Sequence, residues 1–261
     1  MVSRKRRRMA PGRESAPASD GWIWLYGRHA VLAALANPDR TCGRLLVTRE
    51  CADLVADPGA APGAAWAPEP VAKRDLDARF GGAAHQGIAA AFAPGPEPDL
   101  NRVCAGDGAA LVVVLDRVTD PGNVGAVIRS AAAFGARAVV TTRRHAPEPA
   151  GALAKAASGT LERVPYLRVA NLARALDDLA ALGYWCLALD RAAGQDLAAV
   201  PDYRRVALIL GAEGSGLRRL TAEHADLTVR IPMAPGVESL NVSNAAAVAL
   251  HHLAGGLGLL A

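Results

Sequence analysis

The chain has 261 residues and a formal net charge of +4, with 51% hydrophobic and 21% charged residues. This balance excludes a disordered chain, and the length allows one large domain or two of ordinary size. The alanine-rich runs are interrupted by Gly, Arg and Asp. No stretch of about 18 apolar residues predicts a bilayer span, so we expect no membrane partner.

The excess positive charge lies at the N-terminus. Residues 1–20 carry six basic and two acidic side chains, whereas residues 21–261 carry equal numbers of each. A sequence pI near 9.1 favours a nucleic-acid partner, but here the high pI comes from the first 20 residues and not from the rest of the chain. We interpret these 20 residues as a disordered basic arm. The arm lacks the apolar core of a secretory signal, and the four cysteines have no C-x-x-C spacing. We expect reduced thiols and a cytoplasmic protein.

Residues 21–94 contain short elements of both types and predict a small α/β domain. Its helix candidates are 27–35 and 73–80, its strand candidates are 45–48 and 87–92, and the Pro/Gly/Ala-rich stretch 57–70 predicts a loop. We interpret Trp22, Trp24 and Tyr26 as packing residues. His85 has no second His or Cys at ligand spacing nearby, so we expect a turn residue and no metal site. The proline cluster at 94–98 starts a linker that we place at 95–108.

The pattern changes after the linker, and we assign 109–261 to a second domain. Continuous apolar runs occur at 111–115, 138–141, 185–189, 206–210 and 227–231, and helical periodicity occurs at 124–134, 171–182 and 243–253. Runs of this kind are typical of strands buried on both faces. The alternation of strands and helices predicts an α/β domain with a mostly parallel sheet.

Three glycine-containing junctions follow or flank the buried strands. They are DRVTDPGNVGAVIR (116–129), GAEGSG (211–216) and IPMAPGVESLNVSN (231–244). Ligands of open α/β sheets bind outside the carboxyl ends of the strands, so these junctions form a candidate ligand site. None of them is a G-x-G-x-x-G turn or a P-loop.

The three segments, in this order and spacing, resemble the motifs of the SpoU (TrmH) family of RNA 2′-O-methyltransferases, within the SPOUT superfamily. The resemblance covers about 109–253. YGRHAVLAAL and HQGIAA look like the substrate-binding domain of the ribosomal-RNA guanosine branch. The resemblance implies a parallel α/β sheet with a deep trefoil knot, an exception to the rule against threading. It also implies S-adenosylmethionine as cofactor, ribosomal RNA as partner, and a homodimer formed through the knotted domain.

The resemblance also implies roles for individual residues. Cofactor contacts fall on Gly211, Ala212, Glu213, Gly214, Ile231, Met233, Leu240, Asn241 and Ser243. Catalytic roles fall on Arg129, Asn123, Glu213, Ser239 and Asn241. We expect RNA contacts from basic residues in or near these loops, namely Arg117, Arg129, Arg143, Arg144 and Lys155.

Some roles stay open at this point. Arg129 either activates the 2′-hydroxyl or grips the target phosphate, and the second role suits a group that rarely releases its proton. Glu213 is expected to orient Arg129 through a charge-assisted pair. Asn123 either positions the substrate or only caps the following helix. His251 and His252 are expected on a solvated or dimer face.

The predicted function is S-adenosylmethionine-dependent methylation of a ribose 2′-hydroxyl, at a guanosine of large-subunit ribosomal RNA. Transfer-RNA methylation is one alternative, and methylation of a ribosomal-RNA adenosine, as in the antibiotic-resistance branch, is another. A non-catalytic RNA-binding or ribosome-assembly factor is a third. The separate N-terminal domain favours ribosomal RNA, and the intact motifs favour an enzyme.

Overall fold

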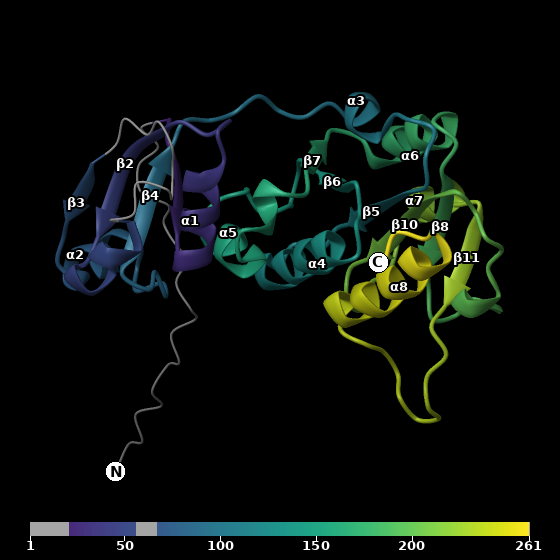
Figure 1. The fold of residues 1–261 in the computed structure, drawn as a ribbon. Coiled ribbons are helices and arrows are strands. Elements are labelled where there is room, and N and C mark those ends of the chain that lie inside the picture. Colours follow the sequence, from purple (N-terminus) through teal and green to yellow (C-terminus); the bar gives the residue numbers. More distant parts are fainter. Residues whose placement is uncertain (1–20, 56–66, 261) are drawn as a thin grey trace, which may run out of the picture.

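The computed structural model describes residues 21–55 and 67–260, and it contains two β-sheets (Figure 1). The expected basic arm, most of the expected loop at 57–70, and Ala261 lie outside the described residues. None of the helices within the described ranges is both long and apolar enough to cross a bilayer. The predicted fold class, a parallel-sheet α/β domain preceded by a small α/β domain, is confirmed.

The N-terminal domain is a four-stranded sheet in the order β1-β4-β2-β3. Its elements are β1 (Ile23–Tyr26), α1 (Arg28–Ala36), β2 (Cys42–Val47), the 3-10 segment η1 (Arg49–Val55), β3 (Pro68–Pro70), α2 (Lys73–Arg79) and β4 (Ile88–Phe92). All five residues of β4 are buried, since apolar side chains from α1 and from α2 cover the two faces of the sheet. Trp24 and Tyr26 pack against Phe80 in the second of these clusters.

The strand β3 lies inside the stretch 57–70, where we predicted a loop. It pairs in parallel with β2 at the edge of the sheet, where proline is tolerated because one side of the strand needs no ladder donor.

A short helix, α3 (Leu100–Cys104), lies inside the segment that we predicted as a linker. The carboxylate of Asp99 accepts a hydrogen bond from the Arg102 backbone N–H at 2.8 Å and caps the helix. Leu100 and Cys104 are buried against the second domain. The proline cluster ends at Pro98, so it does not prevent a helix from starting one residue later.

The C-terminal domain is a seven-stranded sheet in the order β7-β6-β5-β10-β8-β11-β9, and every neighbouring pair is parallel. Its strands are β5 (Ala110–Asp116), β6 (Ala138–Thr142), β7 (Tyr166–Val169), β8 (Trp185–Leu189), β9 (Gln195–Asp196), β10 (Arg205–Gly211) and β11 (Leu227–Arg230). Its helices are α4 (Pro121–Ala133), α5 (Gly151–Ala157), α6 (Leu172–Ala181), α7 (Arg219–Glu223) and α8 (Val242–Gly256), with the 3-10 segments η3 (Thr160–Glu162) and η4 (Leu197–Ala199).

Helices cover both faces of this sheet. Buried residues of α4 and α8 form the apolar cluster on one face, and residues of α3 and α6 form the cluster on the other. The central strands β5 and β10 are therefore almost wholly apolar. The order of the strands brings the loops after β5, β8, β10 and β11 to one edge of the sheet.

The buried carboxylate of Asp116 joins two of these loops. Asp116 ends β5, and it accepts hydrogen bonds from the Arg218 backbone N–H at 2.9 Å and from Arg218 Nε at 2.7 Å. A fully buried charge is stable only when it is paired and hydrogen-bonded, which this arrangement achieves. The pair holds the glycine loop after β10 against the end of β5.

Candidate functional site

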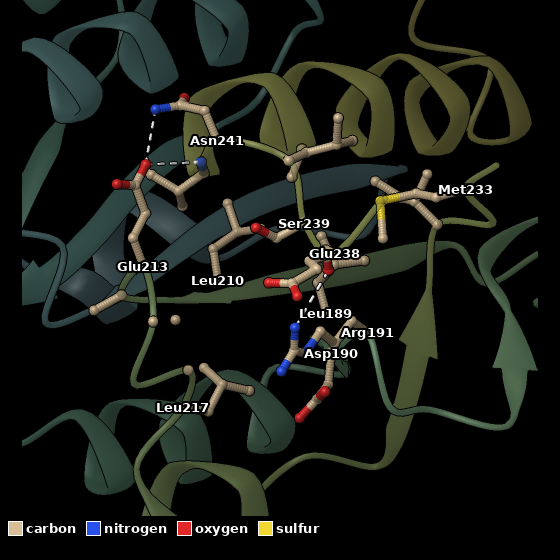
Figure 2. Close-up of a pocket in the computed structure, with 18 residues that line it drawn as sticks. Leu189, Asp190, Arg191, Leu210, Glu213, Leu217, Met233, Glu238, Ser239 and Asn241 are labelled. Atoms are coloured by element: carbon tan, nitrogen blue, oxygen red, sulfur yellow. Dashed lines mark hydrogen bonds between the residues drawn. The ribbon is translucent and has the colours of Figure 1, made fainter. Parts of the chain in front are cut away.

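A pocket of about 620 Å³ lies at the carboxyl ends of β8, β10 and β11 (Figure 2). Residues 210–214, 216 and 217 form one side, residues 231, 233 and 238–242 form another, and residues 189–191 close it from the end of β8. The volume lies in the range of small-molecule sites. Two of the three sequence segments singled out above thus meet at one pocket, and the third reaches it through a hydrogen bond.

Eight of the nine residues expected to contact the cofactor line this pocket, together with Ser239. The ninth, Ser243, lies in the first turn of α8, and its hydroxyl donates to Asn241 Oδ1 at 2.5 Å. The same oxygen accepts from the Ser243 backbone N–H at 2.9 Å, so Asn241 is the N-cap of α8. In this structure, Ser243 fixes Asn241 and does not face the pocket.

The carboxylate of Glu213 is the centre of a hydrogen-bond network. Its Oε1 accepts from Asn241 Nδ2 at 2.7 Å and from the Val242 backbone N–H at 3.3 Å (Figure 2). Asn123 Nδ2 donates to the same oxygen at 3.4 Å. Hydrogen bonds to an ionised acceptor are about twice as strong as neutral ones, so this carboxylate orders the start of α8.

Asn123 connects the first sequence segment to this network. Its Oδ1 accepts a hydrogen bond from Asn241 Nδ2 at 2.9 Å. The cap of α4 is Asp120, whose carboxylate accepts from the Asn123 backbone N–H at 2.7 Å. The alternative in which Asn123 only caps the helix is therefore wrong. Its side chain instead joins α4 to the loop before α8.

Arg129 lies apart from the pocket. It is exposed on α4, six residues after Asn123, which corresponds to about 9 Å along the helix axis. A helix turns by about 100° per residue, so Arg129 projects from a different face than Asn123 does. The expected pair between Glu213 and Arg129 does not form, because Glu213 is occupied by Asn241, Val242 and Asn123.

The other predicted RNA-contact residues spread over two places. Arg117, Arg143 and Arg144 are exposed at the ends of β5 and β6, and Arg143 Nη2 pairs with Glu97 at 2.5 Å. Lys155 lies on α5, in a cleft between the two domains that Arg129 also lines. We predicted these five residues together as RNA contacts, but the structure places them in two separate regions.

Sequence reasoning missed the side of the pocket formed by the end of β8. Asp190 and Arg191 line it, and Arg191 Nη1 donates to the Glu238 backbone oxygen at 3.3 Å. The signal was present, because a strand at 185–189 was predicted and ligands gather beyond the carboxyl ends of parallel strands. Within the described ranges, no group of three or more His, Cys, Asp or Glu residues is placed to hold a metal ion.

Two family models match the chain, one for each domain. Residues 110–251 match the SpoU rRNA methylase family, and residues 24–98 match the RNA 2′-O ribose methyltransferase substrate-binding family. The chain belongs to the SpoU rRNA methylase family.

Curated relatives share both domains. The chain is 38% identical over 234 residues to the 23S rRNA (guanosine-2′-O-)-methyltransferase RlmB of Bordetella pertussis, an alignment that covers 87% of this chain and 94% of the relative. It is 45% identical over 184 residues to the protein of the same name from Xylella fastidiosa, covering 69% and 74% of the two chains.

A solved structure has the same two-domain fold. The SpoU methyltransferase AviRb from Streptomyces viridochromogenes, in complex with AdoMet, superposes with a TM-score of 0.76 at 25% identity, over 90% of each chain. The family predicted from the three motifs and from the N-terminal segment is therefore confirmed.

Proposed function

We propose that this protein transfers a methyl group from S-adenosylmethionine to the ribose 2′-hydroxyl of a guanosine in 23S ribosomal RNA. The observation that carries the proposal is the pocket after β8, β10 and β11, which the family's motifs line in a chain that also has the matching substrate-binding domain. The relatives named for this reaction cover most of the chain, which supports the choice of substrate.

The pocket suits the methyl donor in size and in the groups that it presents. Its lining combines the apolar side chains of Leu210, Ile231 and Leu240 with backbone polar groups of the glycine loop at 211–216. Carboxylates of Asp190 and Glu238 also line it, and they favour a positively charged ligand. S-adenosylmethionine, when bound, supplies a methyl group already activated on a sulfonium, so the protein has no leaving group to create.

The residues around the pocket then have a positioning task. Holding the ribose oxygen in line with the methyl group lowers such a barrier by up to about 7–11 kcal/mol in the best model systems. Asn123, Asn241 and Glu213 form the polar edge nearest α4. Arg129 keeps its guanidinium free of partners among the described residues, and we assign it the grip of a substrate phosphate or the activation of the 2′-hydroxyl.

The test is transfer of labelled methyl to purified 23S ribosomal RNA and to transfer RNA, followed by mapping of alkali-resistant ribose sites. We expect label at one guanosine of 23S RNA. Label in transfer RNA alone, or at an adenosine, overturns the proposed substrate. Binding of S-adenosylmethionine without label in any RNA overturns the proposed activity.

We also propose that the protein works as a cytoplasmic homodimer through its C-terminal domain. Val248 is about half exposed on α8, next to His251 and His252, which are exposed on the same helix. Charge at this face opposes self-association, so Val248→Asp is expected to halve the mass measured by light scattering. An unchanged mass overturns the proposed interface.

The trefoil knot belongs to the same proposal. After β11 the chain passes along the pocket and returns as α8, which packs between α4 and β10. This course, together with the family, supports threading of the C-terminal segment through a loop. A crystal structure traced continuously from β8 to α8 tests it. We further propose the division into a substrate-binding domain at 21–94, a connecting segment at 95–108 and a methyltransferase domain at 109–261.

A further inference from the structure

A second cleft, of about 440 Å³, lies between the two domains. Tyr26 and the loop residues Ala83 and Ala84 form its wall on the N-terminal domain. Arg129, Lys155 and Ser158 line it on the C-terminal domain. The helix α5, which carries Lys155, lies between the two sheets in Figure 1.

The walls of this cleft are held together by an interdomain latch. Glu162, on η3, accepts hydrogen bonds from Asn37 Nδ2 at 2.7 Å and from Arg40 Nη2 at 2.8 Å and Nε at 3.1 Å. The Glu162 side chain is only 8% exposed, so solvent screens this ion pair weakly. The latch fixes one domain against the other.

Close packing reinforces the latch. A Cβ atom added at Gly159 would lie 2.8 Å from Ala33 Cβ and 2.9 Å from the His29 backbone oxygen, so the backbones meet more closely than any other residue would allow. Ala154 of α5 is buried in the apolar cluster of the N-terminal domain. The cleft is therefore a built feature of the chain and not a gap between loosely joined domains.

The chemistry of the cleft favours an anion. Among the described residues, Arg129 and Lys155 are its charged lining residues, and no carboxylate of that part of the chain lines it. Ala83, Ala84 and Ser158 are small and leave room beside the two cations. The neighbouring Gln86 adopts a left-handed backbone conformation with φ of 56°, and its side chain accepts a hydrogen bond from the Arg28 backbone N–H. Strain of this kind is kept where surrounding structure over-determines it, often at binding sites.

We propose that this cleft binds the sugar-phosphate backbone of an unpaired RNA strand next to the target nucleotide, with Lys155 and Arg129 contacting its phosphates. The inference rests on the proposed function, because it assigns a path to the RNA substrate. The cleft has the volume of a small-molecule site, which suits a nucleotide of a single strand. Sequence-specific recognition of RNA mostly targets such unpaired segments.

The distribution of lysines allows a direct test. The chain has three lysines, Lys5, Lys73 and Lys155. Lys73 has a side chain that is 76% exposed, on α2, and is not among the lining residues of the cleft. The full-length protein is acylated with a lysine-selective reagent, with and without a saturating 23S RNA fragment, and each site is quantified by mass spectrometry. We expect RNA to slow acylation of Lys155 at least fivefold and to leave Lys73 within twofold.

A pair of variants gives a second readout. Lys155→Gln is expected to raise the RNA KM by about 5–20-fold, to leave kcat and S-adenosylmethionine binding within twofold, and to reduce the slope of log K against log salt by about 0.7, the value for one single-strand phosphate contact. Lys73→Gln, the matched control, is expected to behave as the wild type. Equal acylation of Lys155 with and without bound RNA overturns the inference, as does a Lys155→Gln variant that matches Lys73→Gln.

The outcomes separate this inference from the proposed function. Methyl transfer to 23S RNA without protection of Lys155 overturns RNA binding by the cleft and leaves the proposed function in place. Protection of Lys155 by an RNA that never receives label supports the cleft and overturns the proposed reaction.

Discussion

Asn241 Nδ2 donates to Glu213 Oε1 at 2.7 Å, and this bond joins the cap of α8 to the loop after β10. The same carboxylate oxygen accepts from the Val242 backbone N–H and from the side chain of Asn123. Three segments far apart in the chain are therefore ordered by one carboxylate oxygen. The shape of the pocket depends on it, since residues of two of these segments line the pocket.

Removal of this carboxylate is the first prediction. Glu213→Ala removes the acceptor of three hydrogen bonds, although Asn241 Nδ2 keeps its bond to Asn123 Oδ1, and hydrogen bonds to charged groups contribute about 1.5–3 kcal/mol each. We expect kcat/KM to fall by roughly 30–100-fold and S-adenosylmethionine to bind at least tenfold more weakly, measured by methyl transfer and by calorimetry. Glu213→Gln keeps an oxygen acceptor, so its kcat/KM should fall by only about tenfold.

The matched control is Glu223→Ala. Glu223 pairs with Arg219 on the exposed surface of α7, and surface pairs contribute about 0–1 kcal/mol. This variant should keep the wild-type kcat/KM and the wild-type affinity for S-adenosylmethionine. A Glu213→Ala variant that behaves like it would show that the network does not order the pocket.

The C-terminal sheet was largely predictable from the sequence. Continuous apolar runs predict strands that are covered on both faces, and β8 has the predicted bounds while β5 and β10 differ by one residue at each end. Short elements were missed. The helix α5 is seven residues of mostly small side chains, beginning with Gly151 and followed by Ser158 in a left-handed conformation. Its stability depends on the burial of Ala154 in the other domain, which no local pattern records.

The pocket was more predictable than the cleft. Residues at the ends of predicted parallel strands converge by topology, so Gly211, Ile231 and Leu240 meet as expected. The surroundings of Arg129 depend instead on how the two domains are joined. That arrangement follows from contacts such as Arg40 with Glu162, which lie 122 residues apart. The prediction that Glu213 pairs with Arg129 was wrong for a related reason. Asn123, which does contact Glu213, and Arg129 are six residues apart on one helix and therefore face different sides.

Substitution of Arg129 is the second prediction. Arg129 lines the cleft and not the pocket, so Arg129→Ala should leave S-adenosylmethionine binding within twofold while turnover falls by at least 100-fold. Arg129→Lys keeps one positive charge and loses the planar fork of donors. If the guanidinium grips a phosphate with two hydrogen bonds, the lysine variant should remain at least tenfold impaired at saturating RNA. Nearly wild-type turnover of Arg129→Lys would contradict that grip.

The contact of α4 with α5 gives the third prediction. A Cβ atom at Gly125 would lie 2.4 Å from Ala156 Cβ and 2.8 Å from the Ala157 backbone nitrogen. Gly125→Ala must push the helices apart, and such overpacking costs about 1–3 kcal/mol. We expect urea unfolding to show that the free energy of unfolding falls by this amount. Because α5 forms one side of the cleft, the RNA KM should rise in the same variant.

Gly255 provides the opposite control for Gly125. It lies in α8 with nothing within 4 Å of the position of an added Cβ. Gly255→Ala should stabilise the protein by up to about 1 kcal/mol, the difference in helix propensity between the two residues. If the two alanine variants shift the unfolding free energy in the same direction, close packing is not the reason for glycine at position 125.

Buried thiols give the fourth prediction, a loss of stability at alkaline pH. Burial raises the pKa of the Cys104 thiol to about 11 and that of Cys186 to about 12. An unfolded chain releases these protons near pH 8.5, so between that pH and about 11 the unfolded state binds fewer protons than the folded state. Stability is therefore full below about pH 8.5 and falls as pH rises, by up to about 1.4 kcal/mol per pH unit for each thiol.

Urea unfolding of the wild type and of the double variant Cys104→Ala, Cys186→Ala, between pH 7 and 10.5, measures this effect. The double variant should start less stable, because two packed side chains are truncated. Its free energy of unfolding should then decline less steeply above pH 9, whereas the slopes of the two curves should converge towards pH 7, where both thiols are protonated in either state. Parallel curves over the whole range would show that the alkaline loss comes from other groups, such as Tyr184, whose pKa is also raised by burial.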